Sequence, residues 1–108
     1  ESLKKYHDFQ KVYKAGKSYG NKYLVMYVME NGLNCNRLGI SVSKKVGNSV
    51  VRHRLTRLIR ESYRLKEEKF QCGYDIIVIA RVGAKEKSYW DIESALIHLG
   101  HLHNIIYE

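Results

Sequence analysis

Apolar residues recur at helical spacing near the start of the chain. They occupy one face of an expected helix over residues 6–15: Tyr6, Phe9, Val12 and Tyr13. Lys11 and Lys14 lie between them, and Gly16 follows as a stop signal. Because the stripe is mostly aromatic, packing in a hydrophobic core is its first interpretation.

A second amphipathic pattern begins at Ser88, which we expect to cap a helix. Its apolar positions are Trp90, Ile92, Ala95, Leu96 and Leu99. We expect this helix to cover a sheet and to fray near Gly100.

Three segments have the composition or the period of β-strands. Residues 23–29, YLVMYVM, are an apolar run of β-favouring residues, and Asn31-Gly32 behind it indicates a turn. Residues 37–43, RLGISVS, alternate apolar positions with small and polar ones. We expect these two strands to pair as a hairpin whose small, polar face could hold an extended ligand. Residues 74–82 are apolar almost throughout, as in a strand buried on both faces.

A third amphipathic segment lies between the second and third of these strands. Gly47 allows a sharp bend, and Asn48 or Ser49 is expected to cap a helix. On a projection of roughly 100° per residue, the following residues gather on one side: Val51, Leu55, Leu58, Ile59, Ser62 and Leu65. The opposite side is basic and contains His53, Arg57, Arg60 and Arg64. Arg52 and Arg54 flank the apolar stripe, so this helix can dock on a sheet and still expose a basic ridge.

The elements follow in the order helix, two or more strands, helix, strand, helix. This order predicts an α+β sandwich of two layers, with the basic helix in a crossover between strands. The chain has 108 residues, 44% of them hydrophobic, which suits one modest core. No linker or repeat divides it, so we expect a single monomeric domain over residues 1–108. Because the chain begins on Glu1 and not on Met, we expect that a short leading segment has been removed or left out.

Positive charge is concentrated between Lys44 and Lys66. The chain contains 19 Lys and Arg against 11 Asp and Glu, for a formal net charge of +8. Eight of these bases and one acid, Glu61, lie in that segment, which therefore carries +7, while eleven bases and ten acids leave +1 elsewhere. A concentrated charge of this kind favours a polyanionic partner. We expect nucleic acid and no membrane, since no stretch is long and apolar enough to span a bilayer.

Residues suited to catalysis or metal binding are scattered. The acids occur singly or beside bases, whereas a metal-dependent nuclease needs clustered carboxylates. His98, His101 and His103 lie close together, but no Cys or carboxylate completes a metal site there. Cys35 and Cys72 belong to no CxxC pair, which favours two free thiols in a reduced cytosol and leaves a disulfide open.

The segment SKKVGN, residues 43–48, precedes the basic helix and faintly resembles a phosphate-binding loop. It lacks the glycines and the GK[ST] sequence of a nucleotide-binding loop, so we expect no nucleotide cofactor. The same backbone and its two lysines would suit a phosphate within a longer polynucleotide.

Residues 41–61, SVSKKVGNSVVRHRLTRLIRE, resemble the signature segment of the bacterial ribonuclease P protein family, K-x-G-N-A-V-x-R-N-R-x-K-R-x-x-R. The residues on its fixed positions are Lys45, Gly47, Asn48, Val50, Arg52, Arg54, Arg57 and Arg60. DFQKVYKAGKS, NKYLVMYVM and YDIIVIAR resemble the family's first helix, the next strand and the strand after the basic helix. Three positions depart from the pattern: His53 replaces Asn, Thr56 replaces Lys and Ser49 replaces Ala.

The resemblance implies a cytoplasmic protein subunit of a ribozyme that removes the 5′ leader from precursor tRNA. In that family the RNA subunit carries the active-site metal ions. We therefore expect no catalytic residue, metal or cofactor on this chain, and a Mg²⁺ requirement in the RNA-based active site. The implied partners are the catalytic RNA and the single-stranded leader. The implied fold has a left-handed βαβ crossover through the basic helix, against the usual right-handed preference.

Two groups of site residues follow from the resemblance together with the charge pattern. The first group is expected to bind RNA: Lys44, Lys45, Asn48, Arg52, His53, Arg54, Arg57, Arg60 and Arg64. The second is expected to line a cleft between the first helix and the sheet, where the leader would lie: Phe9, Tyr13 and Tyr27. Aromatic faces in such a cleft can stack on bases with little sequence preference.

Two other functions fit the composition. One is a generic RNA- or DNA-binding module, such as a ribosomal protein, with no part in tRNA processing. The other is a protein-interaction or membrane-surface domain that uses a basic amphipathic helix. The second is disfavoured because the fold needs the apolar stripe of that helix for its own core.

Overall fold

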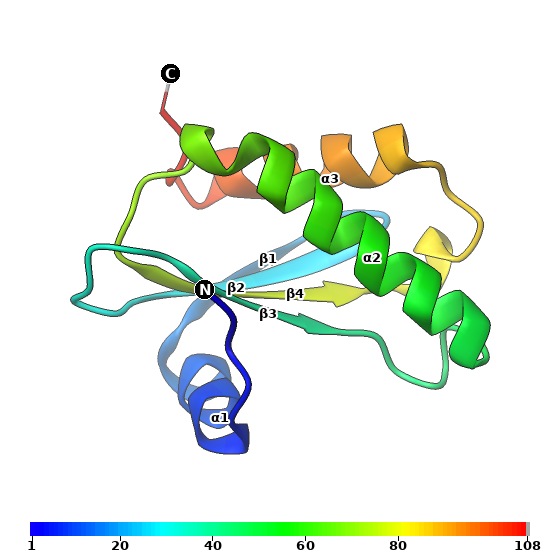
Figure 1. Ribbon diagram of the computed structural model, residues 1–108, viewed down its shortest axis with the longest axis horizontal. Coiled ribbons are helices and arrows are strands. Elements are labelled where there is room, and N and C mark those ends of the chain that lie inside the picture. The colour runs from blue at the N-terminus through cyan, green and yellow to red at the C-terminus, as the bar shows by residue number, and fades with distance from the viewer. Residues whose placement is uncertain (108) are drawn as a thin grey trace.

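A computed structural model describes residues 1–107 of the chain. Its elements, in chain order, are α1 (Tyr6–Ala15), β1 (Lys17–Gly20), β2 (Leu24–Glu30), β3 (Arg37–Ser41), α2 (Ser49–Lys66), the 3-10 turn η1 (Glu67–Lys69), β4 (Tyr74–Ala80), the 3-10 turn η2 (Val82–Ala84) and α3 (Tyr89–Leu102). The strands form one sheet in the order β1-β2-β4-β3. Helices α2 and α3 cover one face of this sheet and α1 lies against the other (Figure 1). The predicted α+β sandwich is confirmed, with α1 as an additional element on its second face.

The predicted hairpin of β2 and β3 is wrong, because β4 lies between these two strands. Met26 of β2 and Ile40 of β3 are both opposite Val78 of β4, the first in an antiparallel and the second in a parallel pairing. A strand that is apolar on both faces, as β4 is, is stabilised most in the centre of a sheet, where both of its faces are covered. The partner of β2 in a hairpin is β1, whose four residues are all exposed and give no hydrophobic pattern in the sequence.

The loop between β2 and β3 crosses the start of β4 and is fixed there by asparagine side chains. The backbone N–H of Asn31 donates to the carbonyl of Gly73 at 2.9 Å. The buried Asn36 side chain donates to the carbonyl of Gln71 at 2.8 Å and accepts from the N–H of Tyr74 at 2.8 Å. These bonds hold the loop across the start of β4, and so place β3 on its far side.

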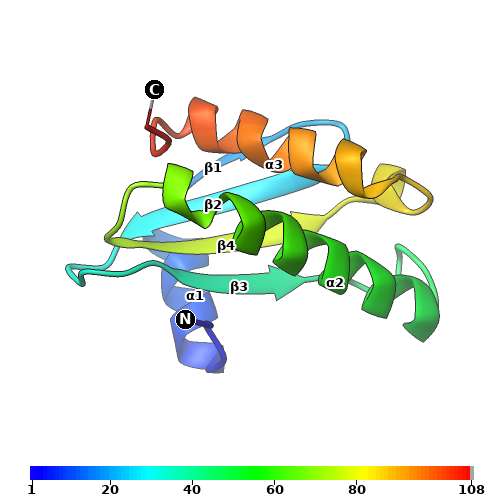
Figure 2. The same cartoon turned by 45° about the horizontal axis from the view of Figure 1, so that its top comes forward.

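The connection from β3 through α2 to β4 is a left-handed crossover. In Figure 2 both strands point to the right, α2 lies in front of the sheet and β4 lies above β3. If the strands are turned to point upward with α2 toward the viewer, the path from β3 to β4 moves to the left. This handedness is the one that the family resemblance implied and the opposite of the usual preference.

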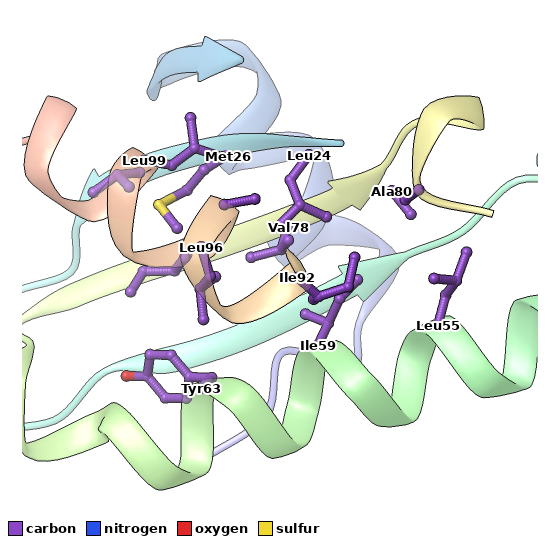
Figure 3. Close-up of a cluster of buried hydrophobic side chains, with 14 of the residues drawn as sticks. Leu24, Met26, Leu55, Ile59, Tyr63, Val78, Ala80, Ile92, Leu96 and Leu99 are labelled. Carbon is purple, nitrogen blue, oxygen red and sulfur yellow. The ribbon is translucent and has the colours of Figure 1, made fainter. Parts of the chain in front are cut away.

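The main core lies between the sheet and the two helices on its first face (Figure 3). Its fully buried members include Leu24, Met26, Val78, Leu55, Ile59, Ile92, Leu96 and Leu99. On α2, Tyr63 is buried while Leu65, which was predicted to face inward, is 51% exposed. Tyr63 packs on Phe70 at 5.0 Å between ring centroids, and its hydroxyl accepts a hydrogen bond from Asn36. These contacts explain why Tyr63, and not Leu65, is buried at the edge of the core.

Two predictions about α3 are wrong. Trp90 is 72% exposed, because it lies two residues before the buried Ile92 and so about 200° away around the helix. The helix also does not fray at Gly100 but continues to Leu102. Gly100 is buried against the side chain of Ile106, so its missing Cβ allows close packing there. The prediction of Ser88 as the helix cap is confirmed, since its hydroxyl accepts from the N–H of Asp91.

Candidate nucleic-acid interface

Helix α2 begins at a tight bend that the sequence specifies. The side-chain oxygen of Asn48 accepts from the N–H of Val51 at 3.0 Å, so Asn48 is the cap and Ser49 is the first helical residue. A Cβ on Gly47 would lie 2.8 Å from the Cβ of Val51, so this position has room for glycine only. The NH₂ group of Asn48 takes no part in this bond and can donate to a ligand.

The predicted basic ridge is present on the outer face of α2 and in the turn before it. The exposed members of the predicted RNA-binding set are Lys44, Lys45, Asn48, His53, Arg54, Arg57, Arg60 and Arg64, and Arg52 is half-buried. Thr56, which stands where the family pattern has Lys, turns its hydroxyl back to the carbonyl of Arg52 at 2.9 Å. The ridge therefore consists mainly of arginine side chains.

Two of the five arginines on α2 have partners within the protein. The guanidinium of Arg54 donates to the backbone carbonyl of Lys87 at 2.6 Å and more weakly to that of Lys85 at 3.4 Å. Arg64 donates to the carboxylate of Glu61 one turn earlier. The Glu61 pairing raises the pKa of Arg64, and the same contact lowers the pKa of Glu61.

The other three arginines of α2 have no carboxylate or carbonyl partner among residues 1–107, and all three line one groove. This α2–β3 groove is lined by Ile40, Val42, Ser49, Arg52, His53, Thr56, Arg57 and Arg60. None of these eight residues is acidic. The Nε atom of Arg52 is buried and has no acceptor in the described part of the chain. A buried N–H without an acceptor costs about 1–3 kcal/mol, which an incoming anionic oxygen would offset.

The three aromatic residues predicted to line the leader cleft lie together on the opposite face of the sheet, in a cluster that we call the aromatic cleft. It is formed by Phe9 and Tyr13 of α1 and Tyr27 of β2, all half-buried. The ring of Tyr13 meets that of Tyr27 edge-on at 5.0 Å between centroids, and Phe9 lies 6.3 Å from Tyr13. The structure brings the three predicted residues together, and their role in lining a cleft for the leader stays a prediction. Tyr6, from the same predicted stripe, is instead 77% exposed.

Small residues of β3 leave room for α1 beside this cleft. Gly39 is buried beneath Phe9, where a Cβ would lie 2.6 Å from the tip of the phenyl ring. Burial raises the pKa of Tyr13, although the neighbouring Ser41 hydroxyl acts in the opposite direction. At ordinary pH Tyr13 is therefore a neutral phenol, able to donate a hydrogen bond as well as to stack.

A charged network that the sequence analysis did not identify joins β3 to β4 and reaches α1. Asp75 of β4 is 1% exposed and accepts from Arg37 at 2.8 and 2.7 Å and from the side chain of Asn31 at 3.0 Å. Arg37 also lies 3.9 Å from the carboxylate of Asp8 on α1. Burial raises the pKa of Asp75, but the hydrogen bonds from Arg37 and Asn31 outweigh it and hold the pKa below its ordinary value. The only feature of the sequence that indicated this network was Asp75 itself, an acid at the start of an otherwise apolar strand.

The edge strand β3 separates the two surfaces. Ile40 lines the α2–β3 groove on one face, while Gly39 approaches Phe9 on the other. Lys44 and Lys45 follow β3 directly and lead into α2. A single bound polymer could therefore follow the edge of the sheet from one surface to the other.

The histidines and cysteines near the ends of the loops make separate contacts. His103 Nε2 lies 2.8 Å from the carbonyl oxygen of Met26, whereas His98 Nδ1 lies 3.1 Å from the side-chain nitrogen of Asn21. Within residues 1–107 no three His, Cys, Asp or Glu side chains are grouped as a metal site. Cys35 and Cys72 are both free thiols, as predicted. No helix in this part of the chain is both long and apolar enough to cross a bilayer.

A basic helix over one face of a sheet and an aromatic cleft on the other define a small α+β protein of the nucleic-acid-binding class. Comparison with known proteins specifies the family. The ribonuclease P family model matches residues 1–103. A ribonuclease P protein component from Lachnoclostridium phytofermentans is 64% identical over 106 residues, which cover 98% of this chain and 91% of the relative.

Solved structures agree with this match. The RNase P protein of Staphylococcus aureus superposes with a TM-score of 0.90 at 39% identity, covering 98% of this chain and 97% of that one. The RNase P protein of Thermotoga maritima gives a TM-score of 0.86 at 33% identity, with 94% and 96% covered. The chain therefore belongs to the ribonuclease P protein family, whose members are subunits of a ribonucleoprotein endonuclease that contains an RNase P RNA.

Proposed function

We propose that this chain acts in the cytoplasm as a monomer that binds the RNase P RNA through α2 and the 5′ leader of precursor tRNA through the aromatic cleft. The observation that carries this proposal is the α2–β3 groove, where three arginines that have no partner among residues 1–107 face a cavity lined by no acidic residue of that range. A guanidinium offers a planar fork of donors that matches phosphate oxygens. The groove is thus suited to the sugar-phosphate backbone of RNA.

The arginines of α2 would have two different roles in binding. Arg52, Arg57 and Arg60 contact phosphates of the RNase P RNA, and the two lysines before the helix extend the region of positive electrostatic potential. Arg54 and Arg64 stabilise the protein surface around the ridge, since their guanidinium groups are already bonded to the loop at residues 85–87 and to Glu61. His53 is exposed beside the groove and adds a hydrogen-bonding ring where the family pattern has Asn.

The cleft would hold the leader as a single strand. Tyr13 and Tyr27 present ring faces at an angle of 82° to each other, so an unpaired base can stack on one ring while the other borders it. Stacking on aromatic side chains contributes about 1–3 kcal/mol per base and depends little on which base is bound. This suits a segment whose sequence differs from one precursor tRNA to another.

The cleavage chemistry would be supplied by the RNA subunit and its Mg²⁺ ions. The described residues offer no cluster of carboxylates to hold such ions, and clustered carboxylates are the usual protein ligands for them. The role of this chain is to bind and orient the precursor, and so to increase the affinity for substrates that carry a leader.

Binding of substrates with and without a leader tests the cleft. Tyr13→Ala and Tyr27→Ala should each weaken the binding of a precursor tRNA with a long leader to the reconstituted holoenzyme by about tenfold, because one stacking contact is lost. Affinity for mature tRNA should stay within about twofold. Dissociation constants measured for both RNAs check this prediction. Equal losses for both RNAs would show that the cleft does not hold the leader.

A further inference from the structure

Trp90, the only tryptophan of the chain, is exposed in the first turn of α3, the helix that packs beside α2, and is not used by the proposed binding surfaces. Its side chain is 72% exposed although it lies in the first turn of α3, a helix whose opposite face is fully buried. An indole ring left largely in water has no packing role in the core. Exposed tryptophan is, however, a common anchor in binding surfaces.

The ring of Trp90 is held in place by its neighbour. Tyr89 lies edge-on to Trp90, with 5.1 Å between ring centroids and 82° between ring planes. The hydroxyl of Tyr89 donates to the carboxylate of Glu93 at 2.8 Å. Burial and the Glu93 carboxylate raise the pKa of Tyr89 to about 12, so this bond persists at ordinary pH. The two rings therefore form a braced aromatic platform at the capped start of α3.

This platform borders the arginines of α2. The loop before it is bonded to α2, since Arg54 donates to the carbonyl of Lys87. The phenol of Tyr89 is close enough to Glu61 and Arg64 for their charges to affect its pKa. A second groove runs along α2 between these contacts and is lined by Arg54, Arg57, Leu58, Arg60 and Glu61. The exposed ring of Trp90 is thus joined to the arginines of α2 through its neighbour Tyr89 and the loop at residues 85–87.

The arrangement also indicates which RNA would be bound. Helices α2 and α3 cover the same face of the sheet, and α1 with the aromatic cleft lies on the opposite face (Figure 2). A leader strand held in the cleft is separated from Trp90 by the thickness of the sheet. An RNA held by the arginines of α2 lies next to it.

We propose that Trp90, braced by Tyr89, stacks on an unpaired base of the RNase P RNA whose adjoining phosphates are held by Arg57 and Arg60. Single-stranded bases splayed out of RNA are commonly recognised by stacking on aromatic side chains beside basic residues. The inference rests on the proposed function, because it extends the same RNA contact from α2 onto α3.

The emission of the single tryptophan gives a direct test with the full chain. Adding RNase P RNA should quench and shift the Trp90 fluorescence, whereas precursor tRNA alone should leave it nearly unchanged. Trp90→Leu should weaken binding of the RNase P RNA by about tenfold, and Trp90→Phe should restore it to within about threefold, since stacking needs a ring and not only an apolar side chain. Tyr6→Leu, a change at an exposed aromatic residue of α1 on the opposite face of the sheet (Figure 2), is the matched control and should bind as the wild type does.

Several results would overturn the inference. Unchanged affinity of Trp90→Leu, or unchanged emission on adding RNase P RNA, would show that Trp90 does not contact that RNA. Equal quenching by precursor tRNA alone would assign Trp90 to the substrate. In these cases the wild-type protein would still bind RNase P RNA with its arginine-dependent affinity, so the proposed function would stand. Thermal melting of both Trp90 variants within a few degrees of the wild type would confirm that folding is unaffected.

Discussion

The arginine side chains of α2 differ in what their guanidinium groups contact, and this difference decides their roles. Arg54 and Arg64 are bonded within the protein, while Arg52, Arg57 and Arg60 line the α2–β3 groove without partners among the described residues. The sequence predicted all five as RNA ligands. It could not separate them, because the acceptor for Arg54 is a carbonyl at residue 87, brought near only by folding.

The salt dependence of binding to the RNase P RNA should distinguish the two groups. Arg57→Ala should lower the slope of log affinity against log salt concentration by about 1, because one phosphate contact and its released counterion are lost. Arg54→Ala should instead loosen the loop that carries Lys85 and Lys87 and leave this slope nearly unchanged. Filter binding across a salt series measures both slopes. A slope reduced equally by the two substitutions would contradict the division of roles.

At the scale of elements, the periodic patterns predicted the three helices and three of the four strands, but not the pairing of the strands. Residues 6–15 form α1 as predicted, and Asn48 and Ser88 cap α2 and α3. The β2–β3 hairpin was wrong because the sequence does not show that β4, later in the chain, inserts between them. The placement of α1 against the sheet followed from the resemblance, and the contact of Arg37 with Asp8 and Asp75 was not predictable, because these acids are distant from it in sequence.

The attachment of α1 should depend on Asp75. Its pKa is held below the ordinary Asp value, so its stabilising contribution is present at neutral pH and is lost as the pH falls below about 3.9 toward the folded-state pKa. Asp75→Asn should therefore lower the free energy of unfolding by about 2 kcal/mol at pH 7, with a difference from the wild type that shrinks in acid. Chemical denaturation at several pH values measures this difference.

Hydrogen exchange locates the effect of the same substitution. The amides of α1 should lose protection in Asp75→Asn before those of α2 do, because Arg37 connects Asp75 to α1 through Asp8. Asp8→Asn is the milder comparison and should cost no more than about 0.5 kcal/mol, since this ion pair is long and partly exposed. If both variants lost the same free energy of unfolding at every pH, the buried Arg37–Asp75 pair would not be the main contributor to this stability.

At the scale of the whole molecule, the two surfaces proposed to bind RNA lie on opposite faces of one sheet and share the edge strand β3. The α2–β3 groove lies on the face covered by α2 and α3, and the aromatic cleft lies on the face covered by α1. The charge pattern predicted the basic ridge of α2, and the resemblance predicted the family and the grouping of Phe9, Tyr13 and Tyr27. Their placement on opposite faces needed the left-handed path through α2, which follows from the family resemblance but not from general preferences for chain connection.

The central claim is that this chain assists an RNA catalyst by binding RNA and does not cleave RNA itself. Cleavage of a precursor tRNA by a bacterial RNase P RNA, measured with and without the protein across a Mg²⁺ titration, tests it most directly. The protein alone should yield no mature 5′ end, and adding it to the RNA should increase the cleavage rate most at low Mg²⁺, where charge repulsion between the two RNAs is least screened. Equal rates with and without the protein at every Mg²⁺ concentration would contradict the account.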